Sequence, residues 1–593
     1  MFGIKHWYYP LLFGFIFIVA FSGWKMYSLP LWGHLPLLFF SALWGIIVLG
    51  FYKFKSNKFE FPKLILGSTI SGLLFALSFP PFGLTPLLFI AWVPLLYIND
   101  SSIINDKFNK LNLFFPYHAF VIWNILTTYW VANAALIPGM VAIWLNSFFM
   151  LIPWWGAVKL SHNKKSINFW ALIFFWMTFE WVHLNWEISW PWLTLGNAFA
   201  SWPSWIQWYE YTGVFGGTLW VLLTNIIFYK IFSVFIKFGR HTLLTNNKKL
   251  LWSFFLLVFI PILISYCVFF TYKTTGVPVE IGIVQPNLEP HYEKFNVPEY
   301  LQLKKFRKLA KEAVSPTTQY LIFPETSFGD PPGNIFRRNE MSSDSRIQDW
   351  QNFISNYENL SIVMGITSMK IIEKNEEITK FSRPFRNLSE PRFYELENSA
   401  IQICKEDPNF QLYRKSKLVP GAEIFPYRKF LPFLKPLVDQ LGGSPAGLAT
   451  QKNRAVISTN NFKIAPVICY ESIYGDYMRG YMKNGAQAIF IMTNDGWWDN
   501  TPGYKQHLAF GALRAIEFRK PIARSANTGI SCFIDIKGII HQPTKYGQDA
   551  AIRGVCNFNN KVTIYCLIGD ALAYLAMIAS LVLIVLSVLT RKR

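Results

Sequence analysis

The sequence predicts a polytopic α-helical membrane domain joined to an α/β domain. Three observations carry this prediction. Of the 593 residues, 52% are hydrophobic and only 15% are charged, and the mean hydropathy is +0.25, so long stretches must face something other than water. Apolar runs of about 16–25 residues, near the length that crosses a bilayer, recur through residues 1–272 and once more near residue 593. Between them, residues 273–565 contain short apolar runs that end in polar residues, as strands do.

The apolar runs predict about ten membrane spans. They lie approximately at 7–27, 30–52, 64–79, 84–98, 115–134, 138–160, 167–184, 213–235, 249–272 and 566–590. We therefore divide the chain into two N-terminal spans (1–60), a polytopic membrane domain (61–272), a domain outside the membrane (273–565) and a last span with a basic tail (566–593).

Basic residues in the loops predict the orientation. They cluster in four loops and in the C-terminal tail: Lys53, Lys55, Lys58 and Lys63; Lys107 and Lys110; Lys164 and Lys165; Lys237, Arg240, Lys248 and Lys249; and Arg591 to Arg593. Counting spans puts all of these on one side, whereas the loop 184–213 has no Lys or Arg. By the positive-inside rule the basic side is cytoplasmic, so residues 273–565 are expected on the opposite side.

Cys469 is the leading candidate for a catalytic nucleophile. It closes the apolar run 462–469, so a strand would present its thiol at the rim of a sheet. Glu325 ends a second such run and Lys415 follows a third. A carboxylate, an amine and a thiol at three strand ends supply the base, cation and nucleophile of an acyl-transfer site. The domain is therefore predicted to be an enzyme.

The order of these three residues and the strings around them resemble the nitrilase (carbon–nitrogen hydrolase) superfamily. The matching strings are Gly282–Asn287 (GIVQPN), Pro324–Glu325, Tyr413–Pro420 (YRKSKLVP), Cys469–Glu471 (CYE) and Thr493–Trp497 (TNDGW). Spread in this order over roughly 215 residues, they form a stronger signal than any one of them alone. The resemblance implies an extracytoplasmic nitrilase-like αββα sandwich at 273–565, with Glu325, Lys415 and Cys469 as its catalytic residues.

The three catalytic candidates have structural alternatives. A free cysteine most often fills a hydrophobic core, and Glu325 is alternatively an ordinary carboxylate at a strand end. Only the resemblance selects Lys415 over the neighbouring Lys417.

Three further residues are candidates for a supporting role. Glu423 matches the acidic residue that accompanies the lysine in the family, although it is alternatively a loop carboxylate paired with Arg428. Glu471 has the same ambiguity, and Tyr470 follows the nucleophile directly. In the helix predicted at 507–520, we interpret His507 as a helix-start residue, and Arg514 and Glu517 as a structural ion pair.

The residue types suggest a mechanism. A thiol of ordinary pKa is mostly protonated at neutral pH, so Glu325 is expected to take its proton as general base. The thiolate attacks an acyl carbonyl, and Lys415 and the backbone N–H after Cys469 stabilise the oxyanion, an effect of roughly 3–4 kcal/mol per donor. Collapse leaves a thioester on Cys469. Water as the second substrate would make a hydrolase, and an amine would make an N-acyltransferase.

The membrane part favours the amine. A polytopic N-terminal half, an extracytoplasmic nitrilase-like domain and one closing span together resemble the bacterial apolipoprotein N-acyltransferases. Phe79–Gly83 (FPPFG) and Trp190–Gly196 (WPWLTLG) are similar to short motifs of that family, and the resemblance covers roughly residues 64–590.

The resemblance implies the substrates and the compartment. The acyl donor is expected to be a phospholipid of the bilayer and the acceptor a diacylglyceryl-modified apolipoprotein, with the catalytic domain on the periplasmic side of the bacterial inner membrane. No cofactor and no metal are expected, and we expect a monomer. The alternatives are a membrane-tethered nitrilase-type amidase and a lipid-binding or transport protein without catalysis. Ionisable residues within the membrane spans distinguish the last class, because a transporter needs them. Apart from a few residues at span ends, Glu180 is almost the only such residue in the predicted spans.

The chain departs from the family pattern in three places. The two spans within residues 1–60 exceed the family's usual eight, and Lys417 stands where the family usually has histidine. The aromatic lid residue of the family, commonly tryptophan, is absent from the segment after the first strand, which leaves Tyr292 and Phe295 as candidate lid residues. The net charge of +21 is not interpreted as a nucleic-acid site, because many of the lysines fix the topology and others face anionic lipid.

Overall fold

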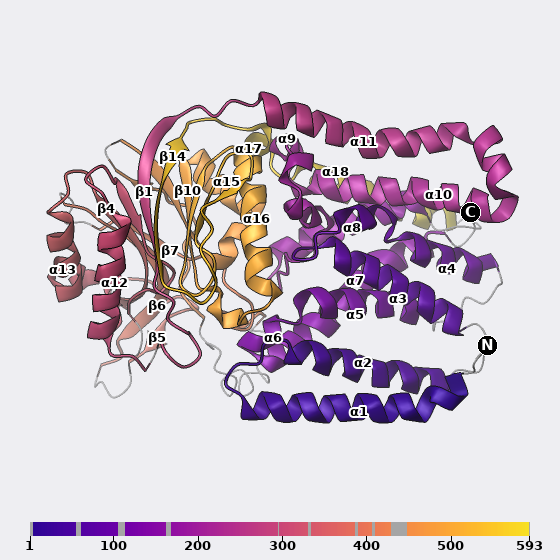
Figure 1. The fold of residues 1–593 in the computed structure, drawn as a ribbon, viewed down its shortest axis with the longest axis horizontal. Helices are drawn as coiled ribbons and strands as arrows, with labels where there is room; N and C mark the ends of the chain where they lie inside the picture. Colours follow the sequence, from indigo (N-terminus) through magenta and orange to yellow (C-terminus); the bar gives the residue numbers. More distant parts are fainter. Residues whose placement is uncertain are drawn as a thin grey trace.

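The computed structural model describes residues 4–54, 61–104, 113–161, 168–294, 296–329, 334–385, 390–405, 410–427, 447–459 and 461–591. A bundle of helices forms one half of the molecule and a two-sheet α/β domain forms the other (Figure 1). The described helices of the bundle are α1 (Ile4–Ser28), α2 (Leu35–Phe54), α3 (Phe61–Ser78), α4 (Val93–Ile104), α5 (Phe114–Thr128), α6 (Val131–Ala134), α7 (Leu136–Lys159), α8 (Phe169–Asn185), α9 (Tyr209–Thr212), α10 (Val214–Asn246), α11 (Lys248–Thr271) and α18 (Ala571–Arg591).

Within the described residues, seven helices are long and apolar enough to cross a membrane: α1, α2, α3, α7, α10, α11 and α18. The other three expected spans are helical but shorter or broken. The 84–98 segment divides into a 3-10 turn, η1 (Thr85–Ile90), and α4. The 115–134 segment is α5 followed by the single turn α6, and the 167–184 segment is the 17-residue α8.

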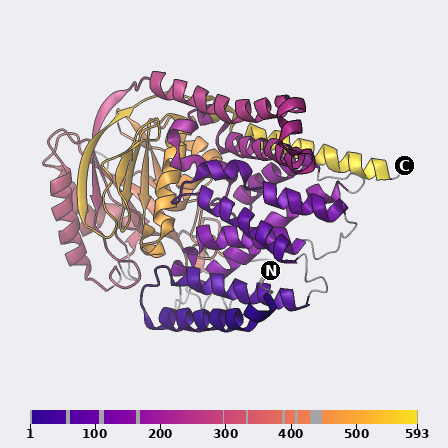
Figure 2. The same cartoon turned by 45° about the vertical axis from the view of Figure 1, so that its right-hand side comes forward.

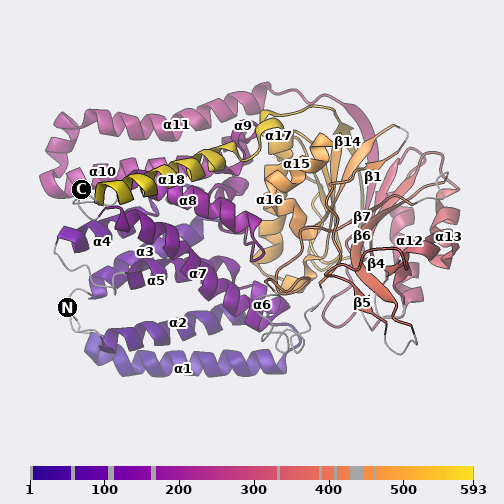
Figure 3. The ribbon, with the colours of Figure 1, turned by 180° about the vertical axis from the view of Figure 1, so that it is seen from behind.

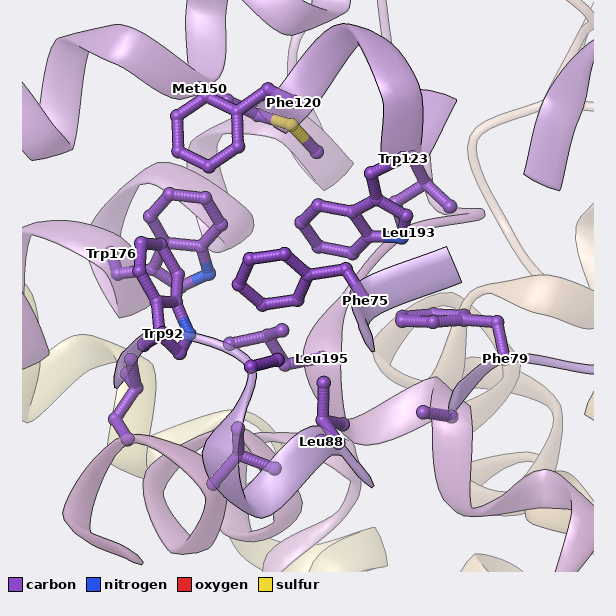
Figure 4. Close-up of a cluster of buried hydrophobic side chains, with 14 of the residues drawn as sticks. Phe75, Phe79, Leu88, Trp92, Phe120, Trp123, Met150, Trp176, Leu193 and Leu195 are labelled. Atoms are coloured by element: carbon purple, nitrogen blue, oxygen red, sulfur yellow. The ribbon is translucent and has the colours of Figure 1, made fainter. Parts of the chain in front are cut away.

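Aromatic side chains fill the centre of the bundle. Phe75 of α3 stacks on Trp123 of α5 with ring centroids 4.5 Å apart, and Trp92 meets the edge of Trp176 at the same separation. Figure 4 shows these rings converging with Phe79 and Phe120. Each ring buries a large apolar area, so these contacts hold together helices whose outer faces are as apolar as their inner ones.

The α/β domain is built from two packed sheets. The first has the order β14-β1-β2-β4-β6-β5, with β3 beside β4 and β7 beside β6; the second has the order β13-β12-β11-β10-β9-β8. The strands are β1 (Val277–Gln285), β2 (Tyr320–Ile322), β3 (Phe336–Arg337), β4 (Ser361–Ile372), β5 (Arg383–Pro384), β6 (Phe393–Ile403), β7 (Leu412–Arg414), β8 (Ile457–Ser458), β9 (Lys463–Ile468), β10 (Ala488–Thr493), β11 (Ile522–Ala526), β12 (Cys532–Ile534), β13 (Ile540–His541) and β14 (Ala550–Phe558).

Helices cover the outer face of each sheet. Helices α12 (Glu299–Ala313) and α13 (Ser345–Ile354) pack on the first sheet, whose inner face shares a core with the second. Helices α15 (Gly475–Lys483) and α16 (Pro502–Phe518) lie on the second sheet, between it and the bundle (Figures 1 and 3). The layers therefore run α, β, β, α, which confirms the predicted sandwich.

Helix α16 joins the two halves. Its Gln506 donates from Nε2 to the carbonyls of Pro80 and Thr127 at 2.8 and 2.9 Å, and Arg519, just after the helix, pairs with Glu210 at 3.0 Å. Gln506 and Arg519 are at most 2% exposed. Buried polar groups are stable only with partners, so these bonds fix the position of the second sheet and its helices against the bundle.

Both termini and the α10–α11 turn lie at the end of the bundle that faces away from the α/β domain (Figures 1 and 2). The described basic residues of the predicted cytoplasmic side, such as Lys53 at the end of α2 and Lys248 at the start of α11, belong to this end. The structure places only part of the basic set, because Lys55, Lys58, Lys107, Lys110, Lys164, Lys165, Lys592 and Arg593 lie outside the described residues.

Candidate active site

Three strand ends bring Glu325, Lys415 and Cys469 together. Cys469 follows β9 directly and opens a 3-10 turn, η7 (Cys469–Ile473); Lys415 follows β7, and Glu325 lies three residues beyond β2. The backbone of Cys469 is left-handed, with φ of 49°. This conformation is uncommon for a residue with a side chain, and it marks the sharp turn from β9 into η7.

The carboxylate and the ammonium form a buried ion pair. Lys415 Nζ lies 2.8 Å from Glu325 Oε1 and 2.8 Å from Glu423 Oε1. Glu325 and Lys415 are 6% and 2% exposed, so each depends on its partner to remain charged. Glu423 therefore meets Lys415, and its alternative partner Arg428 lies outside the described residues.

Asn398 of β6 completes this cluster and was missed by the sequence reasoning. Its Nδ2 donates to Glu325 Oε1 at 2.8 Å and to Glu423 Oε1 at 3.2 Å. A signal was present, because three consecutive polar residues, Glu397–Ser399, stand in the middle of this largely buried strand.

Electrostatics assign different protonation states to the acid and the thiol. Burial acts to raise the pKa of Glu325, but Lys415, Asn398 and a hydrogen bond from the Cys469 thiol outweigh it and hold that pKa below its usual value. Burial raises the pKa of Cys469, and the Glu325 charge raises it further. The resting site therefore holds a carboxylate beside a protonated thiol, which is the arrangement a general base needs.

Glu471 holds the turn at Cys469 in place through hydrogen bonds to two segments of the chain. Its Oε2 accepts from the backbone N–H of Ile468 at 2.9 Å, and its Oε1 accepts from the N–H of Ser416 at 2.7 Å and from the Tyr413 hydroxyl at 2.7 Å. One buried carboxylate thus ties the strand end before Cys469 to the segment that carries Lys415. We infer a positioning role for Glu471.

His507 also holds the nucleophile turn. It lies inside α16 rather than at its start, so the sequence interpretation was wrong on this point. Its Nδ1 lies 2.9 Å from Asp495, and its Nε2 lies 2.9 Å from the Ser472 hydroxyl and 3.1 Å from the Cys469 carbonyl. The ion pair between Arg514 and Glu517 is confirmed at 2.8 Å.

An apolar cavity of 340 Å³ lies beside the site, between the bundle and the α/β domain. Tyr470 lines it next to the nucleophile, and its hydroxyl donates to the Ser189 carbonyl at 2.9 Å. Other lining residues come from both halves of the chain, including Ile137, Leu145, Trp192, Val419, Phe425 and Trp498. Among the candidate lid residues, Tyr292 is 49% exposed in the turn beyond β1, and Phe295 lies outside the described residues.

Two family models match successive parts of the chain. The apolipoprotein N-acyltransferase N-terminal domain matches residues 71–227, and the carbon-nitrogen hydrolase model matches residues 281–551. Residues 1–70 precede both matches.

Curated relatives carry the same name as the first model. An apolipoprotein N-acyltransferase of Chlorobaculum tepidum is 26% identical over 546 residues, which is 88% of this chain and 96% of the relative. One of Geobacter metallireducens is 25% identical, covering 86% of this chain and 92% of the relative.

Among solved structures, Nit3 of Saccharomyces cerevisiae, a member of branch 10 of the nitrilase superfamily, matches 48% of this chain and 92% of its own. The identity is 14% and the TM-score is 0.33.

Since both domain models occur here in one order and the named relatives align along most of the length, the chain belongs to the apolipoprotein N-acyltransferase family, with a carbon-nitrogen hydrolase catalytic domain.

Proposed function

We propose that this protein transfers a fatty acyl chain from a membrane phospholipid, through a thioester on Cys469, to the α-amino group of the N-terminal diacylglyceryl-cysteine of an apolipoprotein. The observation that carries the proposal is the placement of the buried Glu325, Lys415 and Cys469 cluster beside an apolar cavity lined by both halves of the chain. An acyl chain bound in that cavity is removed from water and held next to the thiol.

The chemistry follows from these positions. Glu325 takes the thiol proton, and Cys469 Sγ bonds to the ester carbonyl of the phospholipid while Lys415 stabilises the oxyanion. The C–O bond breaks, the lysophospholipid leaves with the proton from Glu325, and a thioester remains. The acceptor amine then attacks the thioester, and Glu325 takes a proton from that amine. The C–S bond breaks, Glu325 returns the proton to Cys469 Sγ, and the acyl group is left as an amide on the acceptor.

Two other functions fit less well. An amidase would use water in the second step and has no use for an apolar cavity formed with membrane helices. A transport protein needs ionisable groups available within its spans. The Glu180 carboxylate is instead occupied by donors from Trp176, Leu195 and Thr218 at 2.7–3.0 Å, so it serves packing.

The function is tested with an acceptor peptide. Purified protein, mixed with phospholipid and a synthetic diacylglyceryl-cysteine peptide, should add one acyl group to the peptide α-amine. Hydroxylamine should remove the adduct from the protein but not from the peptide, because a thioester is labile and an amide is not. Intact-mass spectrometry distinguishes the two. Release of free fatty acid with an unmodified peptide would instead identify a hydrolase.

We propose further that the enzyme lies in the bacterial inner membrane with its α/β domain in the periplasm. The clustering of Lys and Arg in the loops 53–63, 107–110, 164–165 and 237–249 and in the tail 591–593 supports this orientation. We also propose that it acts as a monomer.

Reporter fusions check the orientation. Fusions after Lys164 and Lys249 should be active only as cytoplasmic reporters, and a fusion at Ser315 only as a periplasmic one. A cytoplasmic signal at Ser315 would refute the proposed compartment and, with it, the lipoprotein acceptor.

A further inference from the structure

A second cavity, of 160 Å³, lies at the junction of the two halves and is lined largely by polar side chains. Its lining includes Asn185, Thr194, Lys417, Asp476, Arg514 and Asp570. Neither the acyl-transfer chemistry nor the apolar cavity uses these groups. The volume is too large for one water molecule, which occupies about 30 Å³ in the liquid.

Lys417 brings a buried positive charge to this cavity. Its Nζ donates to the Leu184 carbonyl at 2.8 Å and lies 4.4 Å from the centre of the Tyr474 ring. Burial, with a contribution from Arg454, lowers the pKa of Lys417 to about 8 against the opposing attraction of Asp476, so the ammonium is mostly charged at neutral pH. In the described part of the chain, no carboxylate lies within 4.0 Å of this ammonium, whereas Lys415 has two. A desolvated cation without a counter-ion is costly unless a ligand supplies one.

Arg514 adds a second donor. Its side chain is 1% exposed, with Nη1 bonded to the Ile473 carbonyl at 2.7 Å and Nη2 to Glu517 at 2.8 Å. The remaining Nε is buried and has no partner among the described residues. Buried guanidinium N–H groups are rarely left unsatisfied, so this Nε is available to a bound acceptor.

The start of α15 adds backbone donors on the same wall. Gly475, Asp476 and Tyr477 line the cavity where the helix begins, and the N-cap residue Tyr474 makes no side-chain cap. A Cβ on Gly475 would lie 2.5 Å from the Tyr565 hydroxyl and 3.2 Å from Arg514 Nη1, so glycine lets these side chains pack closely against the start of the helix. An uncapped helix N-terminus favours an anion.

Two carboxylates also line the cavity, and each has a partner. Asp476 lies 3.0 Å from Arg479 Nε. Asp570 accepts from the Tyr565 hydroxyl at 2.8 Å, and burial together with the Asp476 charge raises its pKa to about 7, so it is partly neutral at neutral pH. Among the described residues, Asp476 Oδ1 and Glu517 Oε2 are also buried without a hydrogen bond, but each of these carboxylates forms an ion pair, with Arg479 and Arg514 respectively.

The polar cavity adjoins the apolar one through Ser189. The Ser189 carbonyl accepts from Tyr470, which lines the apolar cavity, and its Oγ accepts at 2.9 Å from Tyr474, which lines the polar one. Along the chain, Lys415 belongs to the reaction centre, Lys417 to the polar cavity and Val419 to the apolar cavity. One five-residue segment therefore reaches all three places, and a phospholipid carries three matching parts: an ester carbonyl, a phosphate and an acyl chain.

We propose that the polar cavity binds the phosphate of the phospholipid donor through Lys417, Arg514 and the N-terminus of α15, while the acyl chain occupies the apolar cavity. This inference rests on the proposed function and adds a headgroup subsite to it. It also gives Lys417 a role separate from that of Lys415, two residues away.

The test measures acylation of Cys469 alone, before any acceptor is involved. Wild type, Lys417→Gln, Lys417→Arg and the control Lys452→Gln are mixed with phosphatidylglycerol or with diacylglycerol of the same acyl chains, and the adduct is followed by intact mass. Glutamine keeps an amide donor for Leu184 but removes the charge, and Lys452 is an exposed lysine outside the cavity. A soluble p-nitrophenyl ester, which has no phosphate, reports whether the catalytic residues are intact.

Lys417→Gln should raise the half-saturating phosphatidylglycerol concentration by roughly tenfold to a hundredfold, as for a lost hydrogen bond to a charged group. Its rates with diacylglycerol and the soluble ester should match wild type, Lys417→Arg should recover most of the loss, and Lys452→Gln should show none. An equal loss with both lipids would overturn the proposal. Inorganic phosphate is added as a second probe. If it protects Lys417 from chemical modification while the Lys417→Gln variant keeps the wild-type preference between phosphatidylglycerol and diacylglycerol, the cavity binds free phosphate and the headgroup assignment is overturned. Reaction of wild type with the soluble ester but with neither lipid would instead refute the proposed function.

Discussion

Cys469→Ser should abolish the acyl-enzyme, lowering the single-turnover acylation rate at least about a thousandfold. A serine hydroxyl is far less acidic than a thiol, and the depressed pKa of Glu325 makes this carboxylate too weak a base to activate it. The backbone turn should be unaffected, because serine differs from cysteine by one atom and the left-handed φ of 49° is held by surrounding hydrogen bonds. Intact mass after exposure to phospholipid measures the loss.

Two other cysteines provide matched controls. Cys532 is buried in β12, and Cys404 is partly buried just after β6. The Glu325 carboxylate that is paired with Lys415 accepts from the Cys469 thiol, so Cys404→Ser and Cys532→Ser should keep the adduct. Retained turnover in Cys469→Ser would contradict the mechanism. Loss in all three variants would point to a defect in folding.

The convergence of Glu325, Lys415 and Cys469 was predictable because each ends a strand. Strands β9, β10 and β11 are parallel, as are β1, β2 and β4, and the ends of parallel strands meet at one edge of a sheet. The family resemblance then chose Lys415 over Lys417. The structure gives the physical reason, since Lys415 meets two carboxylates and Lys417 faces a different cavity.

What the sequence did not reveal depends on contacts between distant segments. The bond from Asn398 to Glu325 spans 73 residues, and that from Glu471 to Ser416 spans 55. The two cavities exist only where the bundle meets the α/β domain, so no local pattern marks them.

The position of the N-terminal helices α1 and α2 also depends on a contact between distant segments. The N–H of Gly33, in the α1–α2 loop, donates to the Asp499 carboxylate at 2.8 Å. This contact places the loop beside Trp498, which lines the apolar cavity.

Glu325→Gln and Lys415→Met should separate the base from the cation. Glutamine cannot take the thiol proton, so acylation should fall about a hundredfold to ten-thousandfold near neutral pH. Part of this loss should recover as pH rises. The Glu325 charge contributes to the raised pKa of Cys469, and its removal lets thiolate form unaided at lower pH than the intact site would allow.

Lys415→Met should fail differently. Loss of one oxyanion donor costs about a hundredfold to a thousandfold, and no change in bulk proton concentration replaces it, so the deficit should persist at high pH. Glu423→Gln provides the matched control, because Glu423 also bonds Lys415 but is not the proposed base. That variant should lose less activity and keep the wild-type pH profile. Single-turnover acylation rates across pH measure all three, and parallel profiles for Glu325→Gln and Lys415→Met would show that base and cation have been assigned to the wrong residues, even if both residues prove essential.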